Sequence, residues 1–307
     1  MDLDDAVRAW HTDGFAILPG FIPADELAPA VADLGTMFPS PEGFHDGTDP
    51  RRDRFVGDEF DGIDSFPFTA VEVSLLAVHP RVTALAEALL GERDLHLYGA
   101  EAWAKYTGAN DYDQDLHRDY LNHTVLVPTT TPGCGQVEMF VFLTDVPETL
   151  GPPHLVPRKH TAHLPPVPNW FLRPGATGGQ EPTGRFLATG GNEDLYAAEV
   201  SGAGPAGTVI AFDPGTLHRG TQLTEPRGAR YSMHLCFRPA GVQWAHRVGW
   251  AAKSFGAGWF DFVGRATPRQ LELLGFPPPG HPYWTDETLA GMALRYPDLD
   301  LTYWRDR

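Results

Sequence analysis

The sequence lacks several features that would indicate other classes of protein. Of its 307 residues only three are lysine and only two are cysteine, Cys134 and Cys236. Two cysteines cannot supply a disulfide framework or, by themselves, a thiolate zinc cage. The longest strong apolar run is Phe140–Leu143, far short of the roughly 18 residues that a membrane-spanning helix needs. The sequence therefore predicts no membrane partner.

Positive charge is also scarce. The formal net charge of −17 disfavours a broad contact with nucleic-acid phosphates, although an anionic ligand could still bind in a local basic pocket. Met1–Asp5 has neither the basic start nor the apolar stretch of a signal peptide, so we expect a cytoplasmic protein. The preference for arginine over lysine, with 33 Gly and 29 Pro, is typical of a GC-rich bacterial coding sequence.

The composition that remains is that of a globular protein. Hydrophobic residues make up 42% and charged residues 21%, which excludes a disordered or fibrous chain. A chain of 307 residues suits two average domains, but large all-β folds reach this length as one, and we find no linker and no repeat. We expect a single domain with an N-terminal helical portion over 1–93, a β-barrel core over 94–240 and a C-terminal wrap over 241–307.

Hydrophobic periodicity changes along the chain. Before about Asp94 it predicts helices up to Asp13, from about Pro23 to Met37 and over Pro80–Leu90, with one strand over Phe15–Leu18. After that point it predicts β-rich runs at Leu95–Tyr106, His117–Val127, Gln136–Leu143, Gly207–Phe212 and Arg230–Phe237. Short strands separated by turns indicate an antiparallel sandwich or barrel with flanking helices.

One long stretch interrupts this pattern. Residues 164–204 are rich in Gly and Pro, which argues against any regular element there. A loop of this length inside a compact domain is usually functional or disordered. We expect a lid-like insertion over these residues.

Two His-x-Asp pairs occur, and chance alone would produce about two such His-x-acidic patterns from 13 histidines and 40 acidic residues. His11 and Asp13 sit at a predicted helix end, where residues two apart point to different faces, so we interpret them as turn residues. His117 and Asp119 lie in an apparent strand. Residues two apart in a strand share a face about 7 Å apart, so these two side chains can approach one metal ion.

A second imidazole follows the turn at Asp213–Gly215. The turn ends the strand Gly207–Phe212, and His218 comes where the β pattern resumes. Two histidines and one carboxylate on one face of an iron leave three coordination positions open, which is the ligand set of non-haem Fe(II) oxygenases. We therefore expect a metal site at His117, Asp119 and His218.

The next strand carries polar groups on one face. Alternation from Arg230 places Ser232, His234 and Cys236 on the same side, and apolar residues on the other. An arginine fork with one hydroxyl suits a carboxylate, so Arg230 and Ser232 form a candidate anion site. Arg227, in the preceding turn, is the alternative anchor.

Together these motifs resemble the phytanoyl-CoA dioxygenase-like branch of the Fe(II)/2-oxoglutarate oxygenases. The likeness covers roughly residues 8–240 and is carried by Asp13–Phe21, His117–Asp119, Phe142–Val146 followed by Pro153–His160, and Gly207–His218 with Arg230 downstream. One departure is Glu148–Gly151, where the family usually has Glu-Asn-Gly. Halogenating relatives lack the metal-binding carboxylate, so the presence of Asp119 favours hydroxylation or another oxidation.

The resemblance implies a double-stranded β-helix, a jelly-roll or cupin-like barrel. It also implies Fe(II) on His117, Asp119 and His218, and 2-oxoglutarate with its 5-carboxylate on Arg230. We expect a dioxygenase that uses O2, hydroxylates a small metabolite or natural-product intermediate, and releases succinate and CO2.

Two alternatives remain open from the residues alone. One is a cupin-type metal enzyme that does not use 2-oxoglutarate and would have no need of Arg230. The other is a non-catalytic barrel that binds a ligand or partner. The sequence does not predict the oligomeric state.

Overall fold

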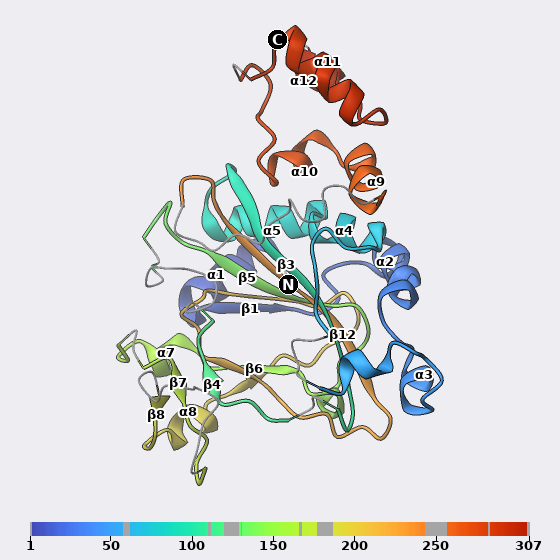
Figure 1. The fold of residues 1–307 in the computed structure, drawn as a ribbon. Helices are drawn as coiled ribbons and strands as arrows, with labels where there is room; N and C mark the ends of the chain where they lie inside the picture. The colour runs from blue at the N-terminus through green and yellow to red at the C-terminus, as the bar shows by residue number, and fades with distance from the viewer. Residues whose placement is uncertain are drawn as a thin grey trace.

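The computed structural model describes residues 2–57, 62–109, 112–119, 129, 131–165, 168–176, 187–242, 257–281 and 283–305. Its centre is a pair of six-stranded sheets (Figure 1). The first sheet has the strand order β1 (Phe15–Leu18), β10 (Val209–Phe212), β5 (Val137–Phe142), β12 (Ala229–Pro239), β3 (Leu95–Tyr106) and β2 (Asp64–Ser65). The second has the order β8 (Leu187–Ala188), β7 (Trp170–Phe171), β4 (Leu116–His117), β11 (His218–Gly220), β6 (Pro153–Leu155) and β9 (Val200–Ser201).

This arrangement confirms the predicted fold class, a mainly β jelly roll with flanking helices. All strand pairs are antiparallel except β7 with β8. Within the described ranges no strand pairing joins one sheet to the other, so the barrel is open rather than closed by hydrogen bonds.

Helices precede, connect and follow the strands. They are α1 (Leu3–Asp13), α2 (Ala24–Met37), α3 (Pro41–His45), α4 (Val71–Ala77), α5 (Pro80–Leu90), α7 (Arg158–Thr161), α8 (Glu193–Ala197), α9 (Ala257–Arg265), α10 (Pro268–Glu272), α11 (Asp286–Arg295) and α12 (Thr302–Arg305), with 3-10 turns at Arg52–Phe55 and Glu148–Leu150. The predicted turn after the first helix is confirmed, because Gly14 ends α1 in the left-handed region with φ 84°. The helices α1, α2 and α5 and the strand β1 lie where periodicity placed them, whereas α3 and α4 were not predicted.

The first sheet separates two cores. Its outer face contributes side chains such as Met139, Met233 and Leu235 to a large apolar core shared with the helices. Its inner face turns toward the second sheet, where Phe142, Phe212 and other apolar side chains form a smaller cluster. Alternation along β5 and β12 therefore sorts apolar side chains outward and leaves several polar ones inside.

The apolar stretch Val71–Leu90 corrects the expectation that Phe140–Leu143 is the longest strong apolar run. It has the length and composition of a helix that could cross a membrane. In the structure it is two helices, α4 and α5, and more than half of its most apolar window is buried inside the protein. Burial of this extent is typical of helices that pack in the core of a folded domain.

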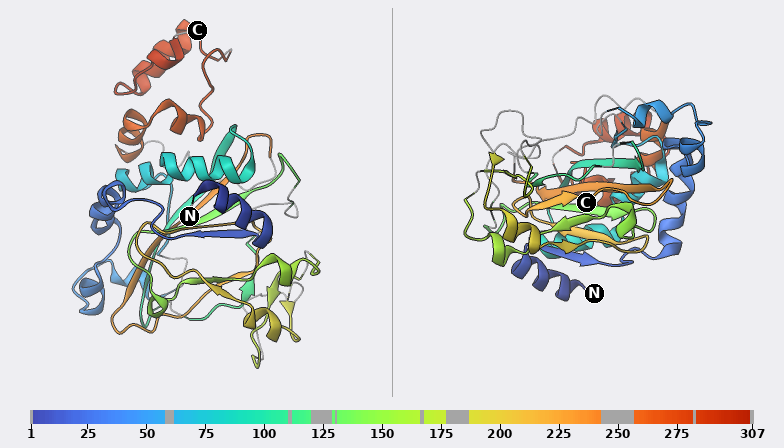
Figure 2. Two further views of the ribbon diagram at one scale, coloured as in Figure 1. Left: turned by 180° about the vertical axis from the view of Figure 1, so that it is seen from behind. Right: turned by 90° about the horizontal axis from the view of Figure 1, so that it is seen from below.

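One predicted segment, 164–204, differs from expectation in its local structure. The described part of 164–204 contains β7, β8, α8 and β9, so its Gly and Pro content did not prevent regular elements. β7 and β9 pair with β4 and β6 and extend the second sheet. The C-terminal helices α9–α12 lie beyond α4 and α5, at the end of the molecule away from the second sheet (Figures 1 and 2).

Candidate metal centre

Two short neighbouring strands bring the two histidines of the predicted site together. His117 on β4 and His218 on β11 are direct partners in the antiparallel pair. Their ring centroids are 4.6 Å apart. The turn before β11 makes this possible, because the Asp213 carboxylate accepts a hydrogen bond from the Gly215 N–H at 2.8 Å and redirects the chain from the first sheet to the second.

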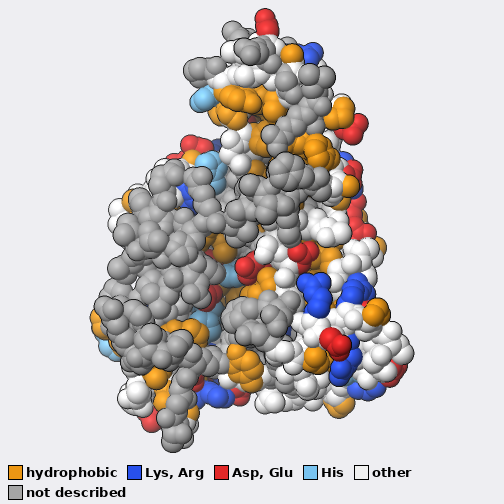
Figure 3. All heavy atoms as spheres, viewed as in Figure 1, with side chains coloured by type: hydrophobic (Ala, Val, Ile, Leu, Met, Phe, Trp, Pro, Cys, Tyr) orange, Lys and Arg blue, Asp and Glu red, His pale blue; other side chains and the backbone are white. Residues whose placement is uncertain are grey.

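Asp119 completes the group from just beyond β4. Its Oδ1 lies 3.4 Å from His117 Nε2, and its Oδ2 lies 3.1 Å from His218 Nε2. The strand β4 covers only Leu116–His117 and Asp119 lies in a turn just after it, so strand alternation does not place the carboxylate. Residues 120–128 lie outside the described residues. Figure 3 shows histidine and acidic side chains together near the middle of one face of the molecule.

The backbone fixes which nitrogen of each imidazole faces the carboxylate. His117 Nδ1 lies 2.8 Å from the Asp115 carbonyl, and His218 Nδ1 lies 3.1 Å from the Thr216 carbonyl. A carbonyl oxygen only accepts, so each Nδ1 carries the hydrogen and donates it. Both Nε2 lone pairs are then directed toward Asp119, as in metal-ligating histidines.

This donor set fits a divalent metal ion. Two lone pairs and a carboxylate that converge repel one another unless a proton or a cation lies among them. Adjacent ligand atoms around an octahedral ion with bonds of about 2.1 Å are about 3 Å apart, close to the separations found here. Burial alone would raise the pKa of Asp119, but His218 and His117 hold it well below its usual range, so the carboxyl is ionised.

Trp170 covers one side of the site. It is the register partner of His117 across β7 and β4, and the two rings stack at 4.5 Å with an interplanar angle of 20°. The stack restricts rotation of the His117 ring. The sequence alone does not predict this stacking on His117, because nothing local distinguishes Trp170 from a packing residue.

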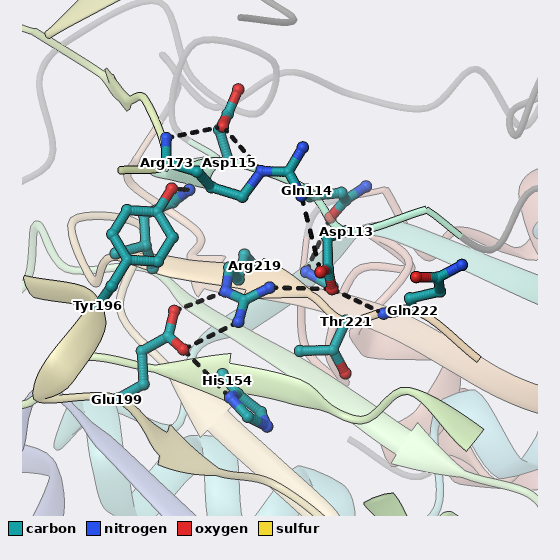
Figure 4. A network of polar contacts seen from close by, with 12 residues as sticks. Asp113, Gln114, Asp115, His154, Arg173, Tyr196, Glu199, Arg219, Thr221 and Gln222 are labelled. Carbon is teal, nitrogen blue, oxygen red and sulfur yellow. Dashed lines mark hydrogen bonds and ion pairs between the residues drawn. The ribbon is translucent and has the colours of Figure 1, made fainter. Parts of the chain in front are cut away.

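A polar network ties the strands that carry the histidines to the 164–204 stretch (Figure 4). Arg219, next to His218, donates to Glu199 at 2.6 and 3.0 Å and to Asp113 at 3.1 Å. Burial opposes ionisation of Glu199, but hydrogen bonds from His154 and Arg219 outweigh it and lower the pKa of Glu199. These contacts give β11 a fixed position relative to the chain that leads into β4.

The start of β4 is held in the same way. The Asp115 carboxylate accepts the Arg173 backbone N–H at 3.1 Å and lies 3.5 Å from the Arg173 Nε. The Tyr196 hydroxyl accepts the Leu116 N–H at 2.9 Å. No sequence pattern predicts this network, because its members are scattered along the chain and no regular spacing connects them.

The two arginines that could bind a ligand carboxylate, Arg230 and Arg227, differ in burial and in their partners. Arg230 is 8% exposed on the inner face of β12, with Ser232 equally buried two residues on. Lys105 on β3 is the register partner of Arg230 and is also buried. Arg227 instead lies in a turn with φ 58°, and its exposed side chain pairs with Asp46 at 2.7 Å.

Comparison with known proteins identifies one family. The family model of phytanoyl-CoA dioxygenase matches residues 10–229. No curated protein sequence matches the chain.

Solved structures resemble the chain in fold. The epimerase SnoN, solved with Fe3+, alpha-ketoglutarate and nogalamycin RO, is 19% identical, with a TM-score of 0.53 over 80% of this chain and 95% of that one. The carbocyclase SnoK from nogalamycin biosynthesis is 16% identical, with a TM-score of 0.55 over 82% and 90%. EctD from S. alaskensis, in its apoform, is 18% identical, with a TM-score of 0.52 over 81% and 82%. At these identities the likeness establishes the fold alone.

Proposed function

The chain belongs to the phytanoyl-CoA dioxygenase family, whose members depend on Fe(II), 2-oxoglutarate and O2, and we propose that His117, Asp119 and His218 hold the Fe(II). The enzyme class follows from family membership: a non-haem Fe(II)/2-oxoglutarate-dependent enzyme of the dioxygenase type. The assignment of the ligands rests on one observation. The three donor atoms lie within 4.8 Å of one another, with both Nε2 atoms directed at the carboxylate.

We assign the 5-carboxylate of 2-oxoglutarate to Arg230 and Ser232. Both side chains face the interior between the sheets and are only 8% exposed, so an anion bound there is largely removed from water. A guanidinium fork and a hydroxyl then replace its hydration shell with hydrogen bonds. Arg227 does not suit this role, because its guanidinium is exposed and paired with Asp46.

The chain's own groups position and shield the reacting centre. An iron ion held by His117, Asp119 and His218 would supply the O2-dependent oxidation of a C–H bond, coupled to conversion of 2-oxoglutarate to succinate and CO2. The backbone carbonyls of Asp115 and Thr216 hold the two imidazoles in the orientation that presents Nε2. Phe212, whose ring centroid lies 4.7 Å from that of His218, keeps water from that side.

We propose a small metabolite or natural-product intermediate as substrate and hydroxylation as the outcome. The fold neighbours include an epimerase and a carbocyclase, so change of configuration and ring closure are the competing outcomes. Product mass separates them: hydroxylation adds one oxygen atom, ring closure removes two hydrogens, and epimerisation leaves the mass unchanged. Candidate compounds are first screened for stimulation of succinate release.

The ligand assignment is tested without turnover. Under anaerobic conditions Fe(II) and 2-oxoglutarate should give a metal-to-ligand charge-transfer band in the wild type. Asp119→Ala should weaken iron binding and remove the band, whereas Asp13→Ala, in the other His-x-Asp pair, should leave it unchanged. A full band in Asp119→Ala would place the iron elsewhere.

A further inference from the structure

A second group of metal-ligating side chains lies on the inner face of the first sheet. Glu138 on β5 and His234 and Cys236 on β12 each offer a ligand atom within 4.8 Å of the others. They are 0%, 5% and 4% exposed. None of them belongs to the iron site proposed above.

Sheet register brings these residues together. Cys236 is the direct partner of Glu138, and His234 lies one alternation step away on the same face. A register shift between β12 and β3 at Cys236/Phe237 leaves Tyr98 as an extra residue, and such bulges re-aim side chains. The Tyr98 hydroxyl thereby reaches the Cys236 sulfur and accepts the Gln136 Nε2 hydrogen bond at 3.0 Å.

The charges in this group call for a cation. A carboxylate with no exposure to water is strongly destabilising unless a positive charge offsets it. Glu138 is 0% exposed and its Oε2 lies 3.2 Å from His234 Nε2, so a divalent cation bound among the three side chains would offset its charge.

The distances also suit a metal. His234 Nε2 is 3.2 Å from Glu138 Oε2 and 3.9 Å from Cys236 Sγ. Around a tetrahedral zinc-type ion, bonds of about 2.0 Å to N and O and about 2.3 Å to S place N and O about 3.3 Å apart and N and S about 3.5 Å apart. A shift of the sulfur by about 0.4 Å toward His234 Nε2 would match both separations, with one position of the tetrahedron left for a further ligand.

We propose that Glu138, His234 and Cys236 form a second metal site, specific for a borderline-soft divalent cation of the zinc type, with the Tyr98 hydroxyl beside the sulfur. Thiolate, imidazole and carboxylate ligands select such an ion. The metal would offset the charge of Glu138 and join β5 to β12. It would stabilise the sheet that carries Arg230 rather than take part in the oxidation.

Two aromatic rings separate this site from the proposed iron site. Phe140 lies 6.0 Å from the His218 ring and 4.9 Å from the His234 ring. Phe212 lies 4.7 Å and 6.1 Å from the same two rings. The two metals would share no ligand, so each can be removed without removing the other.

Cobalt(II) is the probe that tests this site. Reduced, metal-free protein is titrated with Co(II) under nitrogen, and bound cobalt is counted by equilibrium dialysis. We expect two equivalents per chain and a near-ultraviolet thiolate-to-cobalt charge-transfer band, which the iron ligands cannot produce because they include no sulfur. If wild-type protein saturated with cobalt lacks this band, the proposal is refuted. This result can be interpreted without any variant.

Three variants test which residues produce the charge-transfer band. Cys236→Ser should lose the band and one equivalent of cobalt. Cys134→Ser, which alters the only other cysteine, should keep both. His117→Ala should keep the band and lose the other equivalent, which separates this site from the proposed iron site. A band that persists in Cys236→Ser, or disappears in Cys134→Ser, would overturn the assignment.

Discussion

Replacing Arg230 by alanine removes the guanidinium that we assign to the 5-carboxylate of 2-oxoglutarate. Arg230 is 8% exposed, so its anionic partner would enter a site that is almost closed to water. Truncation of one member of a buried, hydrogen-bonded charge pair costs about 2–5 kcal/mol. At about 1.4 kcal/mol per decade, Arg230→Ala should raise the Kd of 2-oxoglutarate roughly 30-fold to several-thousand-fold.

Two neighbouring variants calibrate this effect. Arg227 is 55% exposed and pairs with Asp46, so Arg227→Ala should cost under about 1 kcal/mol, as exposed ion pairs do. Ser232→Ala should remove one hydrogen bond to a charged group, about 1.5–3 kcal/mol. The Kd of 2-oxoglutarate should therefore be highest for Arg230→Ala, lower for Ser232→Ala and close to the wild-type value for Arg227→Ala.

The assay is an anaerobic titration of the Fe(II)–2-oxoglutarate charge-transfer band for each variant. Iron affinity, measured separately, should change little, because none of these residues is a proposed ligand. If Arg227→Ala shows the largest increase in the Kd of 2-oxoglutarate, the carboxylate anchor lies in the turn. If Arg230→Ala binds 2-oxoglutarate as the wild type does, the assignment to β12 is wrong.

Three further predictions follow from the site and its surroundings. His117→Ala should abolish Fe(II) binding and turnover, whereas His11→Ala should retain both; equal effects in an iron-binding assay would contradict the choice between the two His-x-Asp pairs. The lowered pKa of Glu199 stabilises the fold above about pH 4.5, and this contribution is lost as the pH falls from there through the folded pKa. Urea unfolding of Glu199→Gln should therefore depend less on pH below about pH 4.5 than that of the wild type, whereas Glu193→Gln, an exposed change in α8, should behave like the wild type. Limited proteolysis within 164–204 should slow when Fe(II), 2-oxoglutarate and substrate are all bound, and an unchanged cleavage rate would show that this stretch does not close over the substrate.

Local patterns were sufficient to predict much of the fold. Helical periodicity placed α1, α2 and α5, and β3 begins and ends at the predicted residues, Leu95–Tyr106. Alternation also sorted the two faces of β12, with Tyr231 and Met233 in the outer core and Arg230 and Ser232 inside. These features depend on residues a few positions apart, so the sequence contains them directly.

Other features followed from contacts that no local pattern records. The Gly- and Pro-rich stretch 164–204 holds short strands because β4 and β6 provide hydrogen-bonding partners, which overrides weak local propensity. Val71–Leu90 breaks into two helices and lies largely inside the molecule.

The site shows the same division. The sequence by itself supplied His117, Asp119 and His218 as a candidate set, because residue type and spacing carry the donor chemistry. Only the tertiary structure decided that a turn, not a strand, brings Asp119 to both imidazoles. It also decided that Glu138 meets His234 and Cys236, since those residues come from strands nearly a hundred positions apart. Side-chain chemistry is local to each residue, whereas the meeting of distant residues depends on sheet register, which the packing of the whole chain determines.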